Sequence, residues 1–373
     1  MNNILKINKD SDLTHILNIL KQGYCLWIGS GVTKQLDNKS LSWKELTEKL
    51  EKEIVLMEKE RGSYPLRLQK VLKEIGNERF NQLLRKNIIC KLSTNILQFL
   101  EDKTKEEVLR KFSQIAKLGT LANPIVNFNI ETITSRVIAG AAHSFSIKSF
   151  NIAVEEGNRK LYGSSGDHIK NIFQRYVYHP HGALCSGSCV LTQEQYKTQK
   201  DTLAYTLATH MAFQSTLIIV GMSLEDKYLR KQIIKFKNQI KNIYFFSKRK
   251  PSKEILKWIE KNNIHNIQLD SWEIFWENIV EKLPEPNKKN LIYNILSIIN
   301  ECLANQNMSG SYSSFIELAK SGKHPFPEEH IKALIESMHR CGETIDNTEP
   351  NKFDKTSYYK KLFKKLEIKE ECY

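Results

Sequence analysis

Four short, strand-like segments of this chain each run directly into glycine, asparagine or histidine. They fall at residues 24–28, 124–129, 176–178 and 217–220. Unbroken apolar runs of this length indicate strands that are buried on both faces. The sequence between them has apolar residues at helical spacing, and strands that alternate with helices form parallel sheets. We therefore expect an α/β protein whose parallel sheet is covered by helices on both faces.

Polar and glycine clusters mark the carboxyl end of each predicted strand. In a Rossmann-like fold these ends share one edge of the sheet, and ligands bind in the crevice beyond that edge. The clusters are Gly29-Ser30-Gly31, Asn129, the pair His179 and His181, and Gly221 with Ser223. We expect all four to converge on one crevice.

The sequence outside the strands predicts two further regions. Residues 44–118 are Lys/Glu-rich amphipathic helices, which indicates a helical insertion within a domain spanning residues 1–284. Pro284 and Pro286 then introduce a C-terminal helical accessory region at 285–373, with helices near 289–304, 326–340 and 355–368. Oligomer or partner contacts and simple packing on the main domain are both open roles for this region.

The charge of the chain is unevenly distributed. The formal net charge is +14, and the acidic and basic residues from Glu285 onward cancel, so the excess lies in residues 1–284. A basic body suits a nucleotide, a nucleic acid or an acidic partner, and charge alone does not choose among them. A solvated lysine-rich surface explains the excess equally well.

Cysteine usage and the N-terminus predict a cytoplasmic protein. The seven cysteines are odd in number and follow no pairing rhythm, and no apolar signal segment follows Met1. The longest uncharged stretch, Thr202 to Leu224, contains His210 and Gln214. We therefore expect a buried helix and strand there, and no membrane span.

The clusters could support ligand chemistry or plain structure. Glycines after a strand let the backbone approach a phosphate, although such turns are common. Asn129 could hold a water or a ribose hydroxyl, or cap the next segment. His181, followed by Gly182, could accept a proton near pH 7, whereas His179 is read as a structural histidine.

A metal site is not expected. Cys185 and Cys189 lack the second cysteine pair of a zinc module, and we interpret both as ordinary thiols. The two histidines are not accompanied by an acidic cluster that would complete a hydrolytic metal site.

Taken in order, these motifs resemble the sirtuin (silent information regulator) fold, in which glycine, Asn-Ile-Asp, His-Gly and Gly-x-Ser motifs build an NAD pocket. They stand here as Gly29-Ser30-Gly31, Asn129-Ile130-Glu131, His181-Gly182 and Gly221-Met222-Ser223, with Asp226 extending the last. The absence of a zinc module and the Gly221–Asp226 pattern look like the bacterial anti-phage branch.

That resemblance implies an NAD glycohydrolase that releases nicotinamide and ADP-ribose and depletes NAD during phage infection. It implies that Asn129 and His181 are the catalytic residues. It also implies that NAD is the substrate and is bound by residues of all four motifs. The implied NAD-binding residues are Gly29, Ser30, Gly31, Glu131, Gly182, Gly221, Ser223 and Asp226. It also implies a homo-oligomer and a partner such as a HerA-type ATPase.

Two other functions stay open at this point. An NAD-dependent protein deacylase needs the same pocket and an additional acyl-lysine channel. A nucleic-acid-binding or nuclease subunit of a defence complex would use the basic body, including Lys248-Arg249-Lys250.

Overall fold

The computed structural model describes most of the first 302 residues. The described ranges are 4–6, 10–54, 62–141, 148–151, 176–184, 188–199, 216–248 and 250–288, followed by 291, 294–295, 298–299 and 301–302. The helix predicted from about residue 202 and the two later C-terminal helices lie outside these residues.

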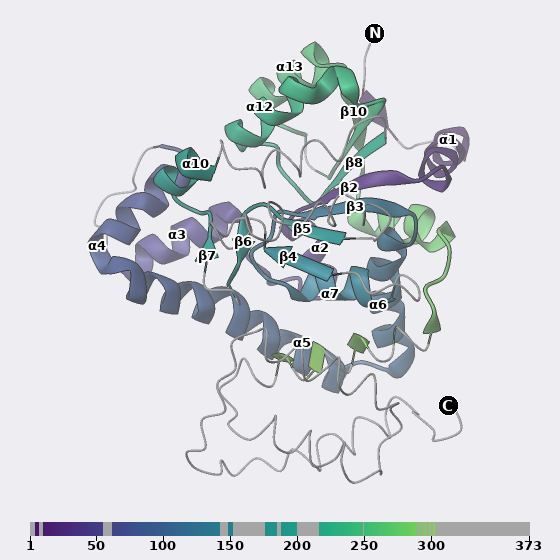
Figure 1. Cartoon of the computed structure of the whole chain (residues 1–373). Helices are drawn as coiled ribbons and strands as arrows, with labels where there is room; N and C mark the ends of the chain where they lie inside the picture. Colours follow the sequence, from purple (N-terminus) through teal and green to yellow (C-terminus); the bar gives the residue numbers. More distant parts are fainter. Residues whose placement is uncertain are drawn as a thin grey trace, which may run out of the picture.

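The described strands form one eight-stranded sheet and a separate two-stranded ladder. The order of the large sheet is β1-β10-β9-β8-β2-β3-β5-β4, and every neighbouring pair in it is parallel (Figure 1). Its strands are β1 (Ile4–Lys6), β2 (Tyr24–Ile28), β3 (Ala122–Asn127), β4 (Lys148–Asn151), β5 (Tyr176–His179), β8 (Thr216–Val220), β9 (Asn242–Ser247) and β10 (His265–Gln268). The small ladder pairs β6 (Gly182–Ala183) with β7 (Ser188–Cys189) in antiparallel fashion. The predicted Rossmann-like α/β class is confirmed.

Strand β2 shows why these segments are continuously apolar. All five of its residues are buried, and successive side chains point to opposite faces of the sheet. Leu26 and Ile28 enter one hydrophobic core, while Cys25 and Trp27 enter the core on the other face. Both faces therefore exclude water, which an alternating polar pattern would not allow.

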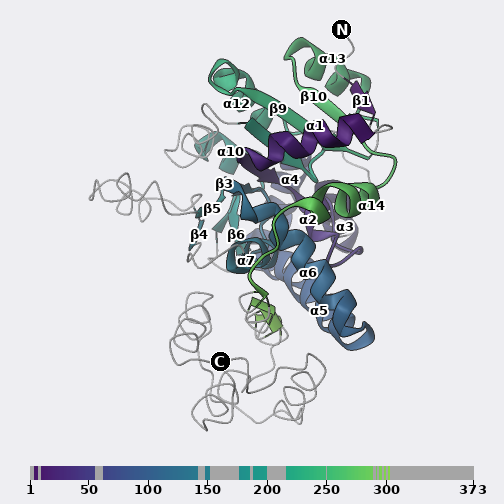
Figure 2. The same cartoon turned by 90° about the vertical axis from the view of Figure 1, so that its right-hand side faces the viewer.

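Helices cover the two faces unequally. The helices α12 (Lys227–Phe236) and α13 (Lys253–Lys261) pack on one face and lie together at the top of Figure 1. The opposite face is covered by α1 (Asp10–Lys21), α6 (Lys105–Thr120), α7 (Ile133–Ala141) and the run α14 (Trp272–Ile274), η4 (Phe275–Ile279) and η5 (Val280–Lys282). Figure 2 shows several of these helices, including α1, α6 and α14, from the side.

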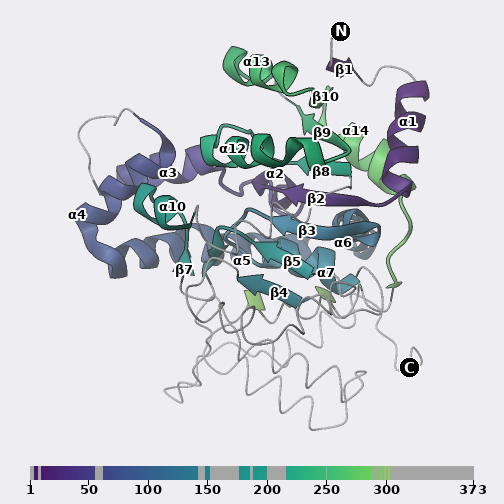
Figure 3. The ribbon, with the colours of Figure 1, turned by 45° about the horizontal axis from the view of Figure 1, so that its top comes forward.

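Residues 44–118 are helical where the structure describes them, and the first part of this range has a hydrophobic core of its own. That core is formed by α3 (Trp43–Glu53), α4 (Tyr64–Leu84) and the π-helix η1 (Arg85–Cys90), and α3 and α4 extend beside the sheet in Figure 3. The rest of the range, α5 (Lys91–Asp102) and α6, packs into the main core instead. Ser42 begins α3 with a reciprocal capping box: its hydroxyl accepts from the Glu45 amide, and the Glu45 carboxylate accepts from the Ser42 amide. Ile130, within the Asn129-Ile130-Glu131 motif, and Leu184, two residues after the His181-Gly182 motif, pack into this separate core. The insertion is thus joined directly to the carboxyl edge of the sheet.

The start of the predicted C-terminal region packs into the main core. Leu291, Ile295 and Ile298 are at most 4% exposed and contact the same core as the sheet. The Asn294 amide also donates to the carbonyls of Arg136 and Val137 at 2.6 and 3.1 Å. A separate accessory domain stays a prediction for residues 303–373.

Some element boundaries differ from the sequence expectation. The helix predicted from Leu224 begins at Lys227, because Leu224 has a left-handed φ of +57° and Asp226 caps the helix through Tyr228 and Leu229. The edge strands β1 and β4 and the ladder β6–β7 were not expected, since each is too short to show a period. The remaining described helices are α2 (Ser30–Thr33), α10 (Gln193–Gln199) and η3 (Lys237–Gln239). No described helix combines the length and apolar character needed to cross a bilayer.

Candidate functional site

The carboxyl ends of β2, β3 and β8 stop at the same level of the sheet. Ile28 pairs with Asn127 on one side and with Val220 on the other. The Gly29 amide donates to the Val220 carbonyl at 3.0 Å, and the Phe128 amide donates to the Ile28 carbonyl at 2.9 Å. The chain leaves β2 toward β3 on one side and later returns to β8 on its other side. Open parallel sheets bind ligands at such a switch point.

Glycines at two of these strand ends pack backbone against backbone. The Gly31 amide donates to the Gly221 carbonyl at 3.0 Å. A Cβ on Gly29 would lie 2.6 Å from the Gly221 carbonyl oxygen, and one on Gly31 would lie 2.6 Å from the Gly221 Cα. Gly221 itself has a φ of +71°, which residues with a Cβ rarely adopt. The glycines are therefore required for the two loops to meet, and their contact with a pyrophosphate stays a prediction.

Thr33 links the glycine loop to the Asn129-Ile130-Glu131 segment. Its hydroxyl accepts a hydrogen bond from the Asn129 amide at 3.1 Å and donates one to Glu131 Oε1 at 2.9 Å. The Thr134 hydroxyl lies 2.8 Å from the Thr33 hydroxyl, and the Thr134 amide donates to Glu131 Oε2 at 3.0 Å. Glu131, and not Asn129, thus bonds the first turn of α7. The carboxamide of Asn129 is free of the capping role that the sequence left open.

Glu131 is a buried carboxyl group, 4% exposed. Burial raises its pKa, because the charged form loses its hydration, and the nearby Glu301 adds to the increase. The hydrogen bonds from Thr134 and Thr33 oppose that shift. Burial is the larger of these effects, so the pKa of Glu131 lies above its ordinary value.

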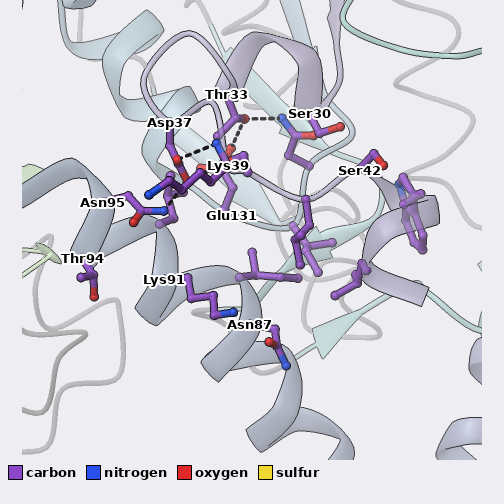
Figure 4. Close-up of a pocket in the computed structure, with 18 of the residues that line it drawn as sticks. Ser30, Thr33, Asp37, Lys39, Ser42, Asn87, Lys91, Thr94, Asn95 and Glu131 are labelled. Atoms are coloured by element: carbon purple, nitrogen blue, oxygen red, sulfur yellow. Dashed lines mark hydrogen bonds between the residues drawn. The ribbon is translucent and has the colours of Figure 1, made fainter. Parts of the chain in front are cut away.

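A cavity of about 330 Å³ opens between this cluster and the helical insertion. Ser30, Asn129 and Glu131 line its sheet side, and Asn87 and Lys91 line the insertion side. Figure 4 shows Ser30 and Glu131 on one side of the pocket and Asn87 and Lys91 on the other, with Thr33 and Glu131 joined by a hydrogen bond. Further lining comes from Phe128 and Ile130, from Asp37 and Lys39 in the loop before α3, and from Trp43 at the start of α3. The volume falls at the lower end of the range for small-molecule sites.

Lysine side chains reach the cavity, whose lining also includes the carboxyl groups of Asp37 and Glu131. Lys39 and Lys91 both line it. Lys49 lies within hydrogen-bonding range of Lys91, and this contact, followed by partial burial, lowers the pKa of Lys49. Ammonium groups placed this close repel one another unless an anion lies between or beside them. Lys91, with Lys49 beside it, therefore offers a cationic contact to a ligand that carries negative charge.

His181 lies behind the cavity wall and is 3% exposed. Its Nδ1 is 3.2 Å from the Phe128 carbonyl oxygen, and its Nε2 is 3.0 Å from the hydroxyl of Tyr196. The rings of Phe128 and Trp43 contact it edge-on, with centroids 5.4 and 5.8 Å away. Burial lowers the pKa of His181, whereas the Asp226 carboxylate and the Phe128 carbonyl raise it. Both ring nitrogens are thus engaged within the protein.

His179 is a fully buried structural histidine. Its Nδ1 lies 3.1 Å from the Asn129 carbonyl oxygen, and its Nε2 lies 2.8 Å from the Ser135 hydroxyl. The Asn127 amide donates to that hydroxyl at 2.7 Å, which leaves the Ser135 proton to bond Nε2. Burial lowers the pKa of His179 to about 4, against the smaller effect of the Asn129 carbonyl. With the His179 ring neutral, its two nitrogens, the Ser135 hydroxyl and the Asn127 amide all have hydrogen-bond partners.

The predicted site residues separate into three groups. Ser30, Asn129 and Glu131 line the cavity, and Gly29, Gly31 and Gly221 form the backbone contact beside it. The others do not line this cavity. His181 lies behind the wall, Gly182 pairs with Cys189 in the small ladder, Ser223 is exposed, and Asp226 caps α12. Their predicted roles toward NAD stay predictions.

Several residues of the site could not be identified from the sequence. Thr33 follows the glycine turn by two residues, and a hydroxyl at that position was the available signal. Asn87, Lys91 and Tyr196 come from helices with no motif of their own. Within the described residues, no three His, Cys, Asp or Glu side chains gather as a metal site.

A central segment of the chain matches a known domain. Residues 125–267 match the model of the SIR2-like domain. The chain is sirtuin-like. The matched segment of the SIR2-like domain begins within β3 and contains the Asn129, His181 and Gly221 motifs, whereas the glycine turn at 29–31 precedes it.

No curated protein matches the chain. The SIR2-like domain indicates a sirtuin-type, NAD-related enzyme, and it supports the sirtuin-like resemblance of the three motifs that lie within residues 125–267.

Proposed function

We propose that this protein is an NAD glycohydrolase that cleaves NAD to nicotinamide and ADP-ribose. The observation that carries the proposal is the cavity at the switch point of the SIR2-like domain, where Ser30, Asn129 and Glu131 meet around one space. These residues come from two separate motifs, and β2 and β3 bring them together at one level.

Cleavage of NAD does not need a strong general acid in the site. The leaving group is a cationic pyridinium, so it departs without protonation, and the transition state resembles an oxocarbenium ion. The site needs to hold the ribose and place a water near its anomeric carbon.

Asn129 is the residue we assign to that water or to a ribose hydroxyl. Thr33 anchors the amide nitrogen, which leaves the Oδ1 of Asn129 to accept a hydrogen bond in the cavity. A carboxamide that is already oriented loses little freedom when the ligand binds. The same Thr33 fixes Glu131, which we assign to the nicotinamide side of the cavity.

His181 is assigned to accept a proton from the ribose hydroxyls or the water. Because Phe128 and Trp43 lie between its ring and the cavity, this role requires NAD to displace one of these side chains. Trp43 is half-buried at the cavity, at the start of a helix in the insertion. We therefore assign to Trp43 the movement that opens the wall. The cationic contact at Lys91 would face a phosphate of the dinucleotide.

The biological role extends this proposal. NAD depletion would act in anti-phage defence, with the protein assembled as a homo-oligomer or with a partner such as a HerA-type ATPase. The support for these statements is the resemblance of the motifs to the defence branch.

The test is nicotinamide release from NAD by the purified protein. Asn129→Ala should lower kcat by about 100-fold or more while the melting temperature changes little. Asn81→Ala, which removes a carboxamide from the exposed surface of α4, serves as the matched control and should keep full activity. Full turnover by Asn129→Ala would overturn the assignment. Turnover that requires an acetylated peptide would instead identify a deacylase.

A further inference from the structure

A chain of three side chains connects His181 to the start of α12. His181 Nε2 is 3.0 Å from the Tyr196 hydroxyl, and that hydroxyl donates to Asp226 Oδ2 at 3.0 Å. Nε2 and Oδ2 are themselves 4.0 Å apart, so the phenol oxygen bridges them. Tyr196 is 3% exposed and lies on α10, a helix that no sequence motif singled out.

Counting protons shows which form of the histidine this chain favours. The Phe128 carbonyl can only accept, so Nδ1 of His181 carries a hydrogen. The phenol has one proton, which can bond either Nε2 or Oδ2 but not both. When His181 is protonated, Nε2–H donates to the phenol oxygen and the phenol donates to Asp226. The chain is therefore complete only with the ring charged.

The surroundings leave Asp226 as the charged group that acts on the ring. Among the described residues packed against His181, Trp43, Phe128 and Tyr196 are aromatic and carry no charge at neutral pH. The Asp226 side chain is 24% exposed, so it keeps some hydration, while the imidazole keeps almost none. The Tyr196 hydroxyl thus connects the buried imidazole to the negative charge of a partly hydrated carboxylate, and this charge favours the imidazolium form.

Asp226 is fixed for this role by its second oxygen. Oδ1 accepts from the amides of Tyr228 and Leu229 at 2.8 and 3.2 Å, as the N-cap of α12. Tyr196 is held by its ring, which stacks on Tyr228 with centroids 5.1 Å apart. Both partners of His181 are therefore positioned independently of any ligand.

We propose that Tyr196 and Asp226 are positioning residues for His181, which hold its ring and stabilise its imidazolium form, in which Nε2–H donates to the Tyr196 hydroxyl and that hydroxyl donates to Asp226 Oδ2. The catalytic meaning of this inference rests on the proposed function. Its physical content, the stabilised imidazolium, does not.

The experiment compares Tyr196→Phe, Asp226→Asn and the control Tyr228→Phe with the unaltered protein. Tyr196→Phe keeps the stacked ring and removes the bridging hydroxyl, and Asn at position 226 keeps an N-cap acceptor without the charge. Tyr228→Phe removes a neighbouring hydroxyl that takes no part in the chain. Melting temperatures establish that all four proteins are folded.

The first readout is the titration of His181 by NMR of protein labelled at histidine, with the signal assigned from its loss in His181→Asn. The pKa of His181 should fall in Tyr196→Phe and in Asp226→Asn and stay unchanged in Tyr228→Phe. Identical titration in all four proteins would overturn the proposal. Because this readout needs no turnover, it stands even if the protein does not cleave NAD.

The second readout is the pH profile of NAD cleavage. Tyr196→Phe and Asp226→Asn should each lose about tenfold or more in kcat with KM nearly unchanged, because the positive charge on His181 forms during the reaction. The acid limb of kcat/KM should move to lower pH, since a less basic His181 stays neutral further into acid. An altered titration without cleavage by the unaltered protein would sink the proposed function alone. Cleavage with unshifted profiles would sink the positioning role.

Discussion

His179 and His181 are two residues apart and both buried, but their hydrogen-bond partners favour opposite protonation states. The chain through Ser135 and Asn127 is complete when His179 is neutral. The chain through Tyr196 and Asp226 is complete when His181 is charged. Burial lowers both pKa values, so the difference comes from the final group of each chain: an amide donor in one and a carboxylate acceptor in the other. The comparison supports a structural role for His179 and our proposal that His181, two residues later, accepts a proton.

The largest expected difference between them is in catalysis. His181→Asn keeps an amide that can donate to the Phe128 carbonyl but has no basic nitrogen. We expect kcat for nicotinamide release to fall by about 100- to 10,000-fold. His179→Asn, its matched counterpart, should keep a far larger fraction of the activity when assayed near neutral pH, where it remains folded. Equal losses in the two variants would remove the distinction.

The second difference concerns stability in acid. In the unfolded chain His179 takes up a proton below its ordinary pKa of 6.5, whereas in the folded protein it does so only near 4. The unfolded state thus binds more protons between these values, and lowering the pH favours unfolding. For this residue alone the free energy of unfolding should drop by about 3 kcal/mol from neutral pH to about pH 4.

Denaturant melts of the unaltered protein and His179→Asn at several pH values check this loss. Glu131, whose pKa is raised, contributes with the opposite sign to the acid dependence of both proteins. Because that contribution is common to the two curves, their difference isolates His179. Parallel curves with the same acid loss would contradict the neutral assignment of His179.

The smallest expected effect sharpens the role of Ser135. Ser135→Ala leaves the Asn127 amide and the His179 Nε2 without their shared partner, which should cost about 1–3 kcal/mol of the free energy of unfolding. Ser113→Ala, whose hydroxyl bonds the exposed Glu285 at 3.3 Å, is the control and should cost about 0.5 kcal/mol or less. Equal costs in the two variants would show that the His179 chain stabilises nothing.

The sequence predicted the sheet and the edge at which its motifs meet. Local signals are sufficient for this, because a strand such as Tyr24–Ile28 that is buried on both faces has to be continuously apolar. A parallel sheet then places its carboxyl ends together whatever the details of packing. The convergence of the glycine turn, Asn129 and Gly221 could therefore be predicted.

What each polar group contacts was decided by tertiary structure. Thr33 lies 96 residues from Asn129 in the chain, and Tyr196 reaches His181 and Asp226 only because α10 packs beside α12. No local pattern encodes such meetings. The glycines show the same limit: their position was evident, but the backbone contact between Gly31 and Gly221 that requires them was not.

The sequence by itself determined the strands, the sheet edge and the residue types available there, since these depend on short-range periodicity and on the geometry of parallel strands. The tertiary structure alone decided that the helical insertion closes the cavity and that His181, and not His179, has a carboxylate at the end of its hydrogen-bonded chain. The physical reason is that a proton acceptor is defined by partners within a few ångströms, and those partners come from distant parts of the chain.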